Sequence, residues 1–452
     1  MREGFKEKIV MKLKNTTREK FRCEVVPNKK IICWGVGKNA IKSIDEFEMS
    51  QSILFCVDSN IDKQGKKWEQ WTVENPMIID KHKDCIVFIT IKEYFAVLEQ
   101  IENKFGDIEV YCYELLQDFE CNLENLEDTW YFERMIRTGL IRYTQNLRDE
   151  KCDEETIQKK VNELGLKLST KTEGEFPVVL PRLVLLLTDK CTLCCEGCCA
   201  FVDRFTNPQH MDAEKLLEGV KTIFRNIDGC INVQLIGGEP FIYPEMGKVL
   251  DFLLTENKVF KIGIVTNGTV IPGDDVLSRI RNEKVFVEIS DYGLLEIQAK
   301  VVNAFEKNKV NFRMFSGQEY WSDYGDPTIC REKTEEELKN EYFHCFDGKK
   351  CKAFDGERLY MCYHAAKMKH LGVEWDYLHD SRSLTDGDIK KNILDCYLQR
   401  YAKACNYCAE MVKDKKQIPV GKQKDRELFK SDYTIISREE LKRLRKNEER
   451  GQ

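Results

Sequence analysis

The sequence predicts an α/β protein with an N-terminal α/β domain, a central partial barrel of parallel strands and a small C-terminal module rich in cysteine. Apolar runs alternate with amphipathic helical segments over residues 182–317, which is the pattern of strand–helix–strand units. A glycine-rich turn follows an early strand, and two cysteine sets lie further along the chain. We place the three parts at residues 1–114, 178–330 and 331–420, with a helical linker over 115–177 and a charged tail over 421–452.

The N-terminal domain begins with a strand-like run, Lys29–Trp34, that leads into the turn GVGKNA. A second run, Ile53–Val57, ends at Asp58, which stands 21 residues after Gly37. This is the Rossmann-like arrangement, in which glycines admit a pyrophosphate to a helix N-terminus and an acid binds a ribose hydroxyl. We therefore expect Gly35, Gly37 and Asp58 to bind a nucleotide, and a structural or docking role for this domain is the alternative.

Charged, periodic and proline-free segments follow the first domain. Residues 120–147 and 154–168 therefore predict linker helices between the two halves of the chain. The tail after Lys422 is rich in lysine and arginine, but acidic residues are interspersed among them. A solvated terminal helix accounts for this pattern better than a nucleic-acid-binding arm does.

Three cysteines, Cys191, Cys195 and Cys198, follow the apolar run Leu183–Leu187 with three and then two intervening residues. Three thiolates in one loop can bind three irons of a cubane cluster and leave the fourth iron open to a small molecule. The neighbouring Cys194 and Cys199 give no frame with the same spacing. Zinc is the alternative, but it usually takes four ligands in paired knuckles.

This loop, CTLCCEGC, resembles the signature of the radical S-adenosylmethionine (radical SAM) enzymes. The segment Gly237-Gly238-Glu239-Pro240 follows a second strand-like run and matches the GGEP motif of that family. The resemblance implies that the glycine carbonyls and the carboxylate receive the methionyl ammonium of SAM. Two glycines allow close approach of the backbone, and an acid supplies the charge that an ammonium needs.

Two further segments extend the resemblance. Thr266 and Asn267 begin a TNG segment that closes a third run, and Ser290 closes a fourth, where the family commonly contacts SAM. Ligands of parallel α/β sheets bind outside the carboxyl ends of the strands, where these segments lie. The resemblance implies a partial (β/α)6 radical SAM barrel. One departure is Gly197, where the family usually has an aromatic residue beside adenine.

A second cysteine set, Cys345, Cys362, Cys405 and Cys408, occupies the C-terminal third. Four thiolates leave no open position, and the set resembles the auxiliary-cluster module called twitch that follows the barrel in some radical SAM enzymes. The resemblance implies a second 4Fe–4S cluster. Cys351 and Cys396 compete as ligands, because sequence alone does not fix which cysteines converge. A zinc ribbon is the alternative use of four cysteines.

The resemblance implies reductive cleavage of SAM to a 5'-deoxyadenosyl radical, which abstracts hydrogen from a substrate carbon. We expect Asp291 or Tyr292 to contact that substrate, with a structural role as the alternative. The segments CTLCCEGCCAFVDRF, ISDYG and CNYC look closer to enzymes of sugars, cyclitols or polyols, which dehydrogenate or dehydrate their substrates. The alternatives are a peptide-modifying radical SAM maturase and a non-catalytic iron–sulfur or zinc protein.

Composition excludes several classes of protein. The formal net charge of −6 gives no nucleic-acid footprint, and no run of eighteen apolar residues predicts a membrane span. The charged N-terminus, MREGFKEKIVMKLK, has no apolar signal-peptide core, so we expect the 20 cysteines to lie in reducing cytoplasm. The expected partners are a carbohydrate-like small molecule and an electron donor such as flavodoxin or ferredoxin.

Overall fold

The computed structural model describes most of the chain outside the termini and the connecting segment. The described residues are 14, 16, 18–91, 94–105, 108–113, 116, parts of 143–163, 178–316, 320–345, 347–348, 351–409 and 417–424. The chain divides into two compact units, Met1–Glu133 with Glu154–Phe176, and Arg134–Asp153 with Pro177–Gln452. The linker helices predicted over 120–147 and 154–168 and the tail beyond residue 424 lie largely outside the described residues.

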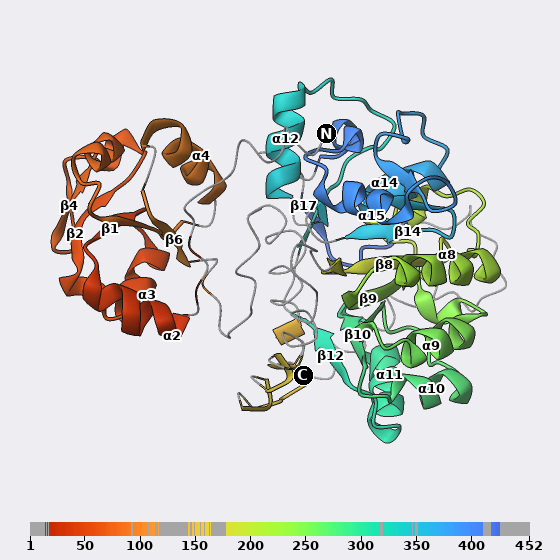
Figure 1. The fold of residues 1–452 in the computed structure, drawn as a ribbon. Coiled ribbons are helices and arrows are strands. Elements are labelled where there is room, and N and C mark those ends of the chain that lie inside the picture. The colour runs from red at the N-terminus through yellow and green to blue at the C-terminus, as the bar shows by residue number, and fades with distance from the viewer. Residues whose placement is uncertain are drawn as a thin grey trace, which may run out of the picture. The chain divides into compact units, whose positions relative to one another are not determined.

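The N-terminal unit is built on a six-stranded sheet with the order β3-β4-β2-β1-β5-β6 (Figure 1). All neighbours in it are parallel except β3 and β4. Counted along the chain, the five parallel strands lie in the order 3-2-1-4-5, which is the strand order of doubly wound α/β folds. The strands are β1 (Ile31–Trp34), β2 (Ile53–Val57), β3 (Lys67–Trp68), β4 (Trp71–Glu74), β5 (Ile86–Ile89) and β6 (Val110–Cys112).

Aromatic side chains fill the core of this unit together with Ala40 and Ile44 of helix α3 (Lys38–Glu46). The unit also contains helices α2 (Arg18–Lys20) and α4 (Tyr94–Phe105). The ring of Phe21 stacks on Phe88 with centroids 4.8 Å apart, and Phe47 meets Phe21 edge-on at 5.2 Å. Strands buried at every position, such as β1 and β5, suit a parallel sheet that is covered on both faces.

The second unit contains a larger sheet with the order β12-β11-β10-β9-β8-β14-β15-β16, and β7 pairs with β9. Strands β8 to β12 are parallel and follow one another along the chain. Their bounds are β7 (Val179–Leu180), β8 (Leu183–Thr188), β9 (Gly229–Gly237), β10 (Val259–Thr266), β11 (Val285–Ser290) and β12 (Phe312–Phe315). The carboxyl ends of these strands therefore meet at one edge of the sheet.

The helices between these strands lie along one side of the sheet (Figure 1). They are α8 (Ala213–Arg225), α9 (Met246–Thr255), α10 (Asp274–Ile280) and α11 (Leu295–Lys307). Asp212 caps α8 by accepting a hydrogen bond from the Lys215 backbone N–H at 2.9 Å, as an N-cap aspartate does. Three-residue and four-residue spacing of apolar side chains buries one face of α8, at Leu216, Val220 and Ile223.

The structure corrects the predicted six-stranded barrel in two respects. Strand β13 (Tyr320–Ser322) does not follow β12 into the large sheet but pairs antiparallel with β17 (Gln417–Pro419). The sixth parallel strand is β14 (Lys352–Phe354), which lies beside β8. The cysteine-rich segment therefore continues the barrel sheet, because β8 offers a free edge that β14 satisfies with backbone hydrogen bonds.

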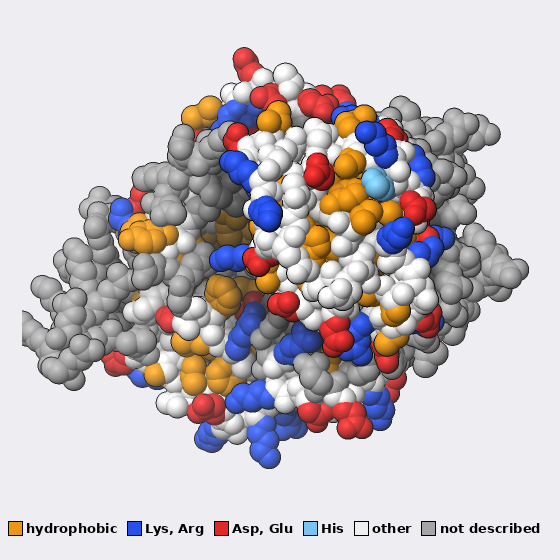
Figure 2. All heavy atoms as spheres, turned by 90° about the vertical axis from the view of Figure 1, so that its left-hand side faces the viewer, with side chains coloured by type: hydrophobic (Ala, Val, Ile, Leu, Met, Phe, Trp, Pro, Cys, Tyr) orange, Lys and Arg blue, Asp and Glu red, His pale blue; other side chains and the backbone are white. Residues whose placement is uncertain are grey.

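The rest of the C-terminal segment surrounds this extension. Strands β15 (Arg358–Tyr360) and β16 (Ser381–Ser383) continue the sheet antiparallel. Among the described residues of this segment, the helices are α12 (Glu335–His344), α14 (Tyr363–His370) and α15 (Ile389–Leu398), with the short η10 (Lys403–Tyr407) near its end. No helix among the described residues is long and apolar enough to cross a membrane. On the face shown in Figure 2, the coloured Lys and Arg side chains are interspersed with Asp and Glu.

Candidate functional site

The structure brings the three cysteines of the first set together in the loop after β8. Burial raises the pKa of the Cys195 thiol well above its ordinary value, and the nearby Cys198 and Cys191 raise it further. Burial also raises the pKa of Cys198. Crowded, buried thiolates repel one another, so a bound cation is what would hold all three deprotonated.

Three neutral N–H groups are directed at two of these sulfurs. The backbone N–H of Leu193 and the side-chain amide of Asn267 each donate to Cys191 Sγ at 3.4 Å. Gln423 Nε2 donates to Cys195 Sγ at 3.0 Å. Cluster thiolates accept hydrogen bonds of this kind, so the donors around the loop fit an iron–sulfur cluster.

Two glycines let the end of β9 pack against the cysteine loop. A Cβ on Gly237 would lie 2.6 Å from the Thr188 carbonyl oxygen, and one on Gly238 would lie 2.2 Å from the Lys190 carbonyl oxygen and 2.8 Å from Cys191 Cβ. The backbone N–H of Gly238 donates to Thr188 O at 2.9 Å. The GGEP segment therefore fits only with glycine at both positions, which places it directly beside Cys191.

Glu239 is fully buried, and its carboxylate joins the loop after β9 to the loop after β10. Its Oε1 accepts from Thr266 Oγ1 at 2.8 Å and from the Phe241 backbone N–H at 3.1 Å, and its Oε2 accepts from the Asn267 backbone N–H at 2.9 Å. The expected contact of this carboxylate with the methionyl ammonium stays a prediction. Burial raises the pKa of Glu239 to about 7, although these hydrogen bonds act to lower it. The next residue, Pro240, begins the short helix Pro240–Ile242.

Asn267 and Gln298 link the loops that follow β8 and β10 and the end of β11 through hydrogen bonds. Besides Cys191, the Asn267 amide donates to Thr192 Oγ1 at 3.0 Å. The buried Gln298 of α11 donates to the carbonyls of Asn267 at 2.9 Å and Ser290 at 2.7 Å. Sequence reasoning missed Gln298. The available signal was a polar residue on the otherwise apolar face of α11 that carries Val301 and Phe305.

The residues expected to contact substrate follow β11. Asp291 Oδ1 accepts from the Gly293 backbone N–H at 3.0 Å, so this carboxylate stabilises a local turn. Tyr292 packs against Cys195 and meets the ring of Trp321 edge-on, with centroids 5.2 Å apart. Burial raises the pKa of Tyr292, and the charge of Cys195 adds to that shift. Tyr292 therefore borders the cysteine loop, and Asp291 shapes the turn that contains Tyr292.

The structure also brings the four cysteines of the second set together. Burial raises the pKa of Cys405 well above its ordinary value, and Cys362, Cys408 and Cys345 raise it further. Cys345 and Cys408 likewise act on Cys362. The backbone N–H of Gly348 donates to Cys345 Sγ at 3.3 Å, a donor of the kind seen at the first set.

The two competing cysteines have other neighbours. Arg182 Nη1 lies 3.7 Å from Cys351 Sγ, and the pKa of Cys351 is raised by burial and by Asp347 to about 12. Cys396 Sγ donates to the Leu359 carbonyl at 3.7 Å. Neither is among the groups that shift the pKa of Cys405.

The spacing of the four sulfurs differs from that of a zinc site. Tetrahedral zinc, with zinc–sulfur bonds of about 2.3 Å, brings its sulfurs to roughly 3.8 Å from one another. Within the part of the chain that the structure describes, the group of three Cys, His or acidic residues whose ligand atoms all lie within 4.8 Å is His82, Asp84 and Cys85. No three of the four sulfurs therefore all lie within 4.8 Å of one another.

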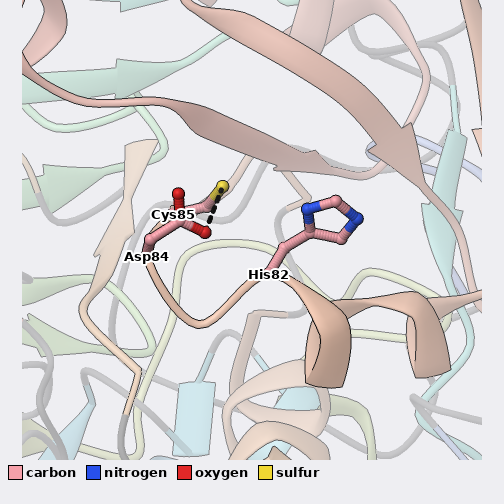
Figure 3. Close-up of side chains that lie close together, drawn as sticks. All are labelled: His82, Asp84 and Cys85. Atoms are coloured by element: carbon pink, nitrogen blue, oxygen red, sulfur yellow. Dashed lines mark hydrogen bonds between the residues drawn. The ribbon is translucent and has the colours of Figure 1, made fainter.

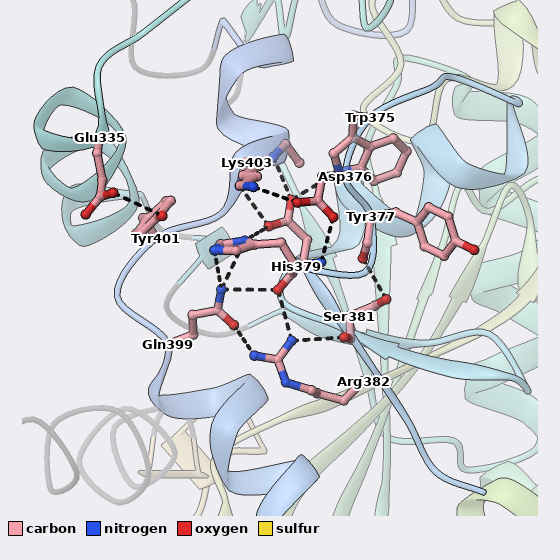
Figure 4. Close-up of polar contacts among 12 residues, drawn as sticks. Glu335, Trp375, Asp376, Tyr377, His379, Ser381, Arg382, Gln399, Tyr401 and Lys403 are labelled. Atoms are coloured by element: carbon pink, nitrogen blue, oxygen red, sulfur yellow. Dashed lines mark hydrogen bonds and ion pairs between the residues drawn. The ribbon is translucent and has the colours of Figure 1, made fainter. Parts of the chain in front are cut away.

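Asp380 fixes the backbone just before Cys405. Its fully buried carboxylate accepts from the Lys403 N–H at 2.8 Å, the Ala404 N–H at 2.6 Å and Trp375 Nε1 at 3.2 Å. Figure 4 shows a polar network that includes Trp375 and Lys403, in which Gln399 faces the ring of His379. This network sets where η10 (Lys403–Tyr407) places Cys405.

Helix α14 connects the two thiol sets. It is capped by Cys362 Sγ, which accepts from the Ala365 backbone N–H at 3.4 Å. Tyr363 Oη donates to the Gly237 carbonyl at 3.5 Å, and the buried Lys367 Nζ lies 2.5 Å from Asp189 Oδ1. Asp189 stands just before the first cysteine loop, so one helix reaches from the second set to the first.

The N-terminal unit places its three expected nucleotide contacts at the end of β1 and β2. Gly35 has φ of +106°, and a Cβ there would lie 2.4 Å from Ile91 Cγ2. Gly37 precedes α3, with open space where a Cβ would lie. The carboxylate of Asp58 accepts from the Asn60 N–H at 2.9 Å and pairs with Lys63 Nζ at 2.8 Å. A ribose hydroxyl would have to share this carboxylate with Lys63.

His82, Asp84 and Cys85 lie together in this unit (Figure 3). Cys85 Sγ is 3.8 Å from Asp84 Oδ1, and burial raises the pKa of the thiol. Asp84 is exposed and lies 3.8 Å from Lys30. Since the Asp84 carboxylate is exposed and already faces Lys30, we assign no metal to this group.

Comparisons with known proteins agree with the geometry of the first site. The family model described as the radical SAM superfamily matches residues 185–307. The antilisterial bacteriocin subtilosin biosynthesis protein AlbA of Bacillus subtilis (strain 168) is 27% identical over 161 residues, which are 34% of this chain and 34% of AlbA. The chain thus matches about a third of the length of this curated relative.

Two solved structures are similar at low identity. Native anSMEcpe with bound AdoMet is 14% identical, with 50% of this chain and 82% of that chain covered and a TM-score of 0.33. Streptococcus suis SuiB bound to the precursor peptide SuiA is 18% identical, with 36% and 38% covered and a TM-score of 0.25. On the family match and the cysteine loop at the end of β8, the chain contains a radical SAM superfamily domain.

Proposed function

We propose that the chain binds a 4Fe–4S cluster through Cys191, Cys195 and Cys198, and SAM beside it. When bound, the cluster supplies an electron that cleaves SAM to a 5'-deoxyadenosyl radical, which takes a hydrogen atom from a substrate carbon. The observation that carries this proposal is the convergence of three thiols with N–H donors directed at two of their sulfurs. The family match over residues 185–307 supports it.

The loops after β9, β10 and β11 are the proposed SAM site. The carbonyl groups of Gly237 and Gly238 would accept from the methionyl ammonium, since these glycines lie directly beside Cys191. Glu239 would act by holding Thr266 and Asn267 in place through its hydrogen bonds. Ser290, whose carbonyl Gln298 holds, would face the carboxylate or ribose of SAM.

Cys345, Cys362, Cys405 and Cys408 are the proposed ligands of a second 4Fe–4S cluster. Their mutual effect on the pKa of Cys405 supports one shared site, and their position after the radical SAM domain favours a cluster over zinc. A second cluster can accept the electron that a substrate radical loses on oxidation. We therefore favour dehydrogenation over a redox-neutral dehydration or deoxygenation, and helix α14 offers a short protein path between the two sites.

For the substrate we propose a peptide. The specific observation in its favour is the match over 161 residues to a protein of bacteriocin biosynthesis. A sugar, cyclitol or polyol is the second candidate, on the resemblance carried by CTLCCEGCCAFVDRF, ISDYG and CNYC. In either case Tyr292 borders the cysteine loop, so its ring would flank the substrate carbon and exclude water from it.

Several partners complete the proposal. A flavodoxin or ferredoxin would deliver the electron in the cytoplasm, where thiols stay reduced. The N-terminal unit would bind a nucleotide or dock the substrate, and the pairing of Asp58 with Lys63 favours docking.

One experiment separates these possibilities. The anaerobically reconstituted chain is incubated with SAM, reductant and either short peptides encoded beside its gene or a panel of nucleotide sugars. Mass spectrometry of both pools should show loss of two hydrogens from a peptide. Loss of water from a sugar would instead support the second candidate. Iron and zinc in the same protein, measured by elemental analysis, should give about eight irons and no stoichiometric zinc.

A further inference from the structure

A segment near the C-terminus, residues 417–424, lies along the first cysteine loop. The Glu196 backbone N–H donates to the Lys422 carbonyl at 2.7 Å, and the Lys424 N–H donates to the Cys194 carbonyl at 2.8 Å. Cys195 and Gln423 form an antiparallel bridge between these bonds. The segment, which we call the C-terminal strap, thus pairs with the loop as a short strand would.

The side chain of Gln423 has only one hydrogen-bonding orientation in this setting. Its Oε1 accepts from the Cys194 backbone N–H at 2.8 Å, which fixes Nε2 on the opposite side. Nε2 then donates to Cys195 Sγ at 3.0 Å and to the Gly421 carbonyl at 2.9 Å. Because a backbone N–H cannot accept, an amide flip would leave two donors facing each other. Gln423 therefore presents a neutral donor to the sulfur of Cys195.

Two glycines permit the close approach of the strap. Gly197 has φ of +66°, and a Cβ there would lie 2.3 Å from Ile418 Cδ1. Gly421 also has φ of +66°, and its Cβ would lie 2.8 Å from Tyr292 Cβ. Ile418 is buried, so its side chain covers the position at which an aromatic residue was expected. The strap can therefore pack against the loop because position 197 has no side chain.

Charge pairs fasten the strap on either side of Gln423. Lys422 Nζ lies 2.5 Å from Glu196, and Lys424 pairs with Asp203, both on the segment that carries the cysteines. Pairing of β17 with β13 fixes its other end. The strap is therefore held at three points, with the amide of Gln423 between them.

We propose that the C-terminal strap is part of the cluster site and that Gln423 is a positioning residue that tunes the cluster through Cys195. This inference rests on the proposed role of Cys195 as an iron ligand. A hydrogen bond to a ligating sulfur stabilises the reduced cluster, because it offsets the added negative charge. Loss of the donor should therefore lower the reduction potential of this cluster and leave the second cluster unchanged.

The test compares Gln423→Leu and Gln423→Glu with wild type in the full, reconstituted chain. The matched control is Gln209→Leu, which makes the same change at an exposed loop position. Iron content and a redox titration followed by electron paramagnetic resonance are measured with and without SAM. The signal that changes on SAM addition identifies the cluster with the open iron, so it separates the first cluster from the second.

We expect Gln423→Leu to shift the midpoint of the SAM-responsive signal to lower potential, Gln423→Glu to shift it further, and Gln209→Leu to leave it unchanged. Selective loss of this cluster in a folded Gln423→Leu protein would also support the inference. Wild-type midpoints in both variants would overturn it while leaving the proposed function intact. Absence of any SAM-responsive cluster in wild type would instead overturn the proposed function. If Gln423→Leu does not fold, Gln423→Asn provides the same comparison.

Discussion

The carboxylate of Glu239 accepts a hydrogen bond from the hydroxyl of Thr266 at 2.8 Å, across the ends of two neighbouring strands. The two residues are 27 positions apart in the sequence and belong to the GGEP and TNG segments. Because the carboxylate is fully buried, it acts as an internal connection between these loops. The proposed SAM site thus depends on a group that water does not reach.

This buried carboxylate predicts a pH dependence of stability for the chain without cluster or SAM. The pKa of Glu239 rises from 4.5 to about 7 on folding, so the folded state keeps a proton that the unfolded state has lost between those values. Its contribution is present below pH 4.5 and is lost as pH rises through 7. Glu239→Gln should remove roughly 3 kcal/mol of this dependence between pH 4.5 and 8.

Urea unfolding at pH 5 and pH 8 checks this expectation, because it gives the free energy of unfolding at each pH and hence the difference between them. Glu357→Gln, an exposed carboxylate paired with Lys215, is the control. A wild-type pH dependence in Glu239→Gln would contradict it.

Lys367→Met should destabilise the fold, because it leaves the buried Asp189 without its closest cation. Removal of one partner from a buried pair costs about 3 to 5 kcal/mol, and we expect the lower end since His370 still lies 3.1 Å from Asp189. Addition of Asp189→Asn should recover most of the loss. Urea unfolding measures the free energy of unfolding of the wild type, the single variant and the double variant. The control is Lys391→Met, which removes an exposed ion pair and should cost less than about 1 kcal/mol. Equal effects of the two lysine variants would refute the buried pair.

Gly197→Ala and Ile418→Ala should show coupled effects on stability. Gly197→Ala places a Cβ against Ile418 Cδ1 and forces alanine into a positive φ. Ile418→Ala removes the side chain that this Cβ would meet. The double variant should therefore be about 1 kcal/mol more stable than the sum of the two single changes predicts. Gly372→Ala, also at positive φ but in open space, isolates the backbone term. Strict additivity in thermal unfolding would show that the strap does not rest on Gly197.

Cys405→Ala should remove the second cluster and leave SAM cleavage intact, because its four proposed ligands are separate from the first loop. Iron should fall by about four per chain while 5'-deoxyadenosine still forms. If the reaction is an oxidation, the oxidised product should disappear, since its electron acceptor is gone. Cys396→Ala, whose thiol faces Leu359, serves as the control. Full turnover without the second cluster would favour elimination over dehydrogenation.

Local patterns in the sequence predicted the parts of the site that lie near one another along the chain. The apolar run of β8 and the cysteine loop after it are contiguous, so periodicity and spacing were sufficient. Residues that reach the loop from far along the chain carried no such signal. Gln423 is 228 positions from Cys195, and β14 joins β8 from the segment assigned to a separate module. Long-range pairing of this kind is decided by tertiary packing.

The central claim is that Cys191, Cys195 and Cys198 hold the cluster that cleaves SAM. The direct measurement is iron content and 5'-deoxyadenosine formation in one anaerobic sample, for wild type and for the variant with alanine at all three positions. Cys194→Ala and Cys199→Ala serve as controls and should behave as wild type. The triple variant should lose about four irons per chain and form no 5'-deoxyadenosine. Continued SAM cleavage by the triple variant would contradict the account.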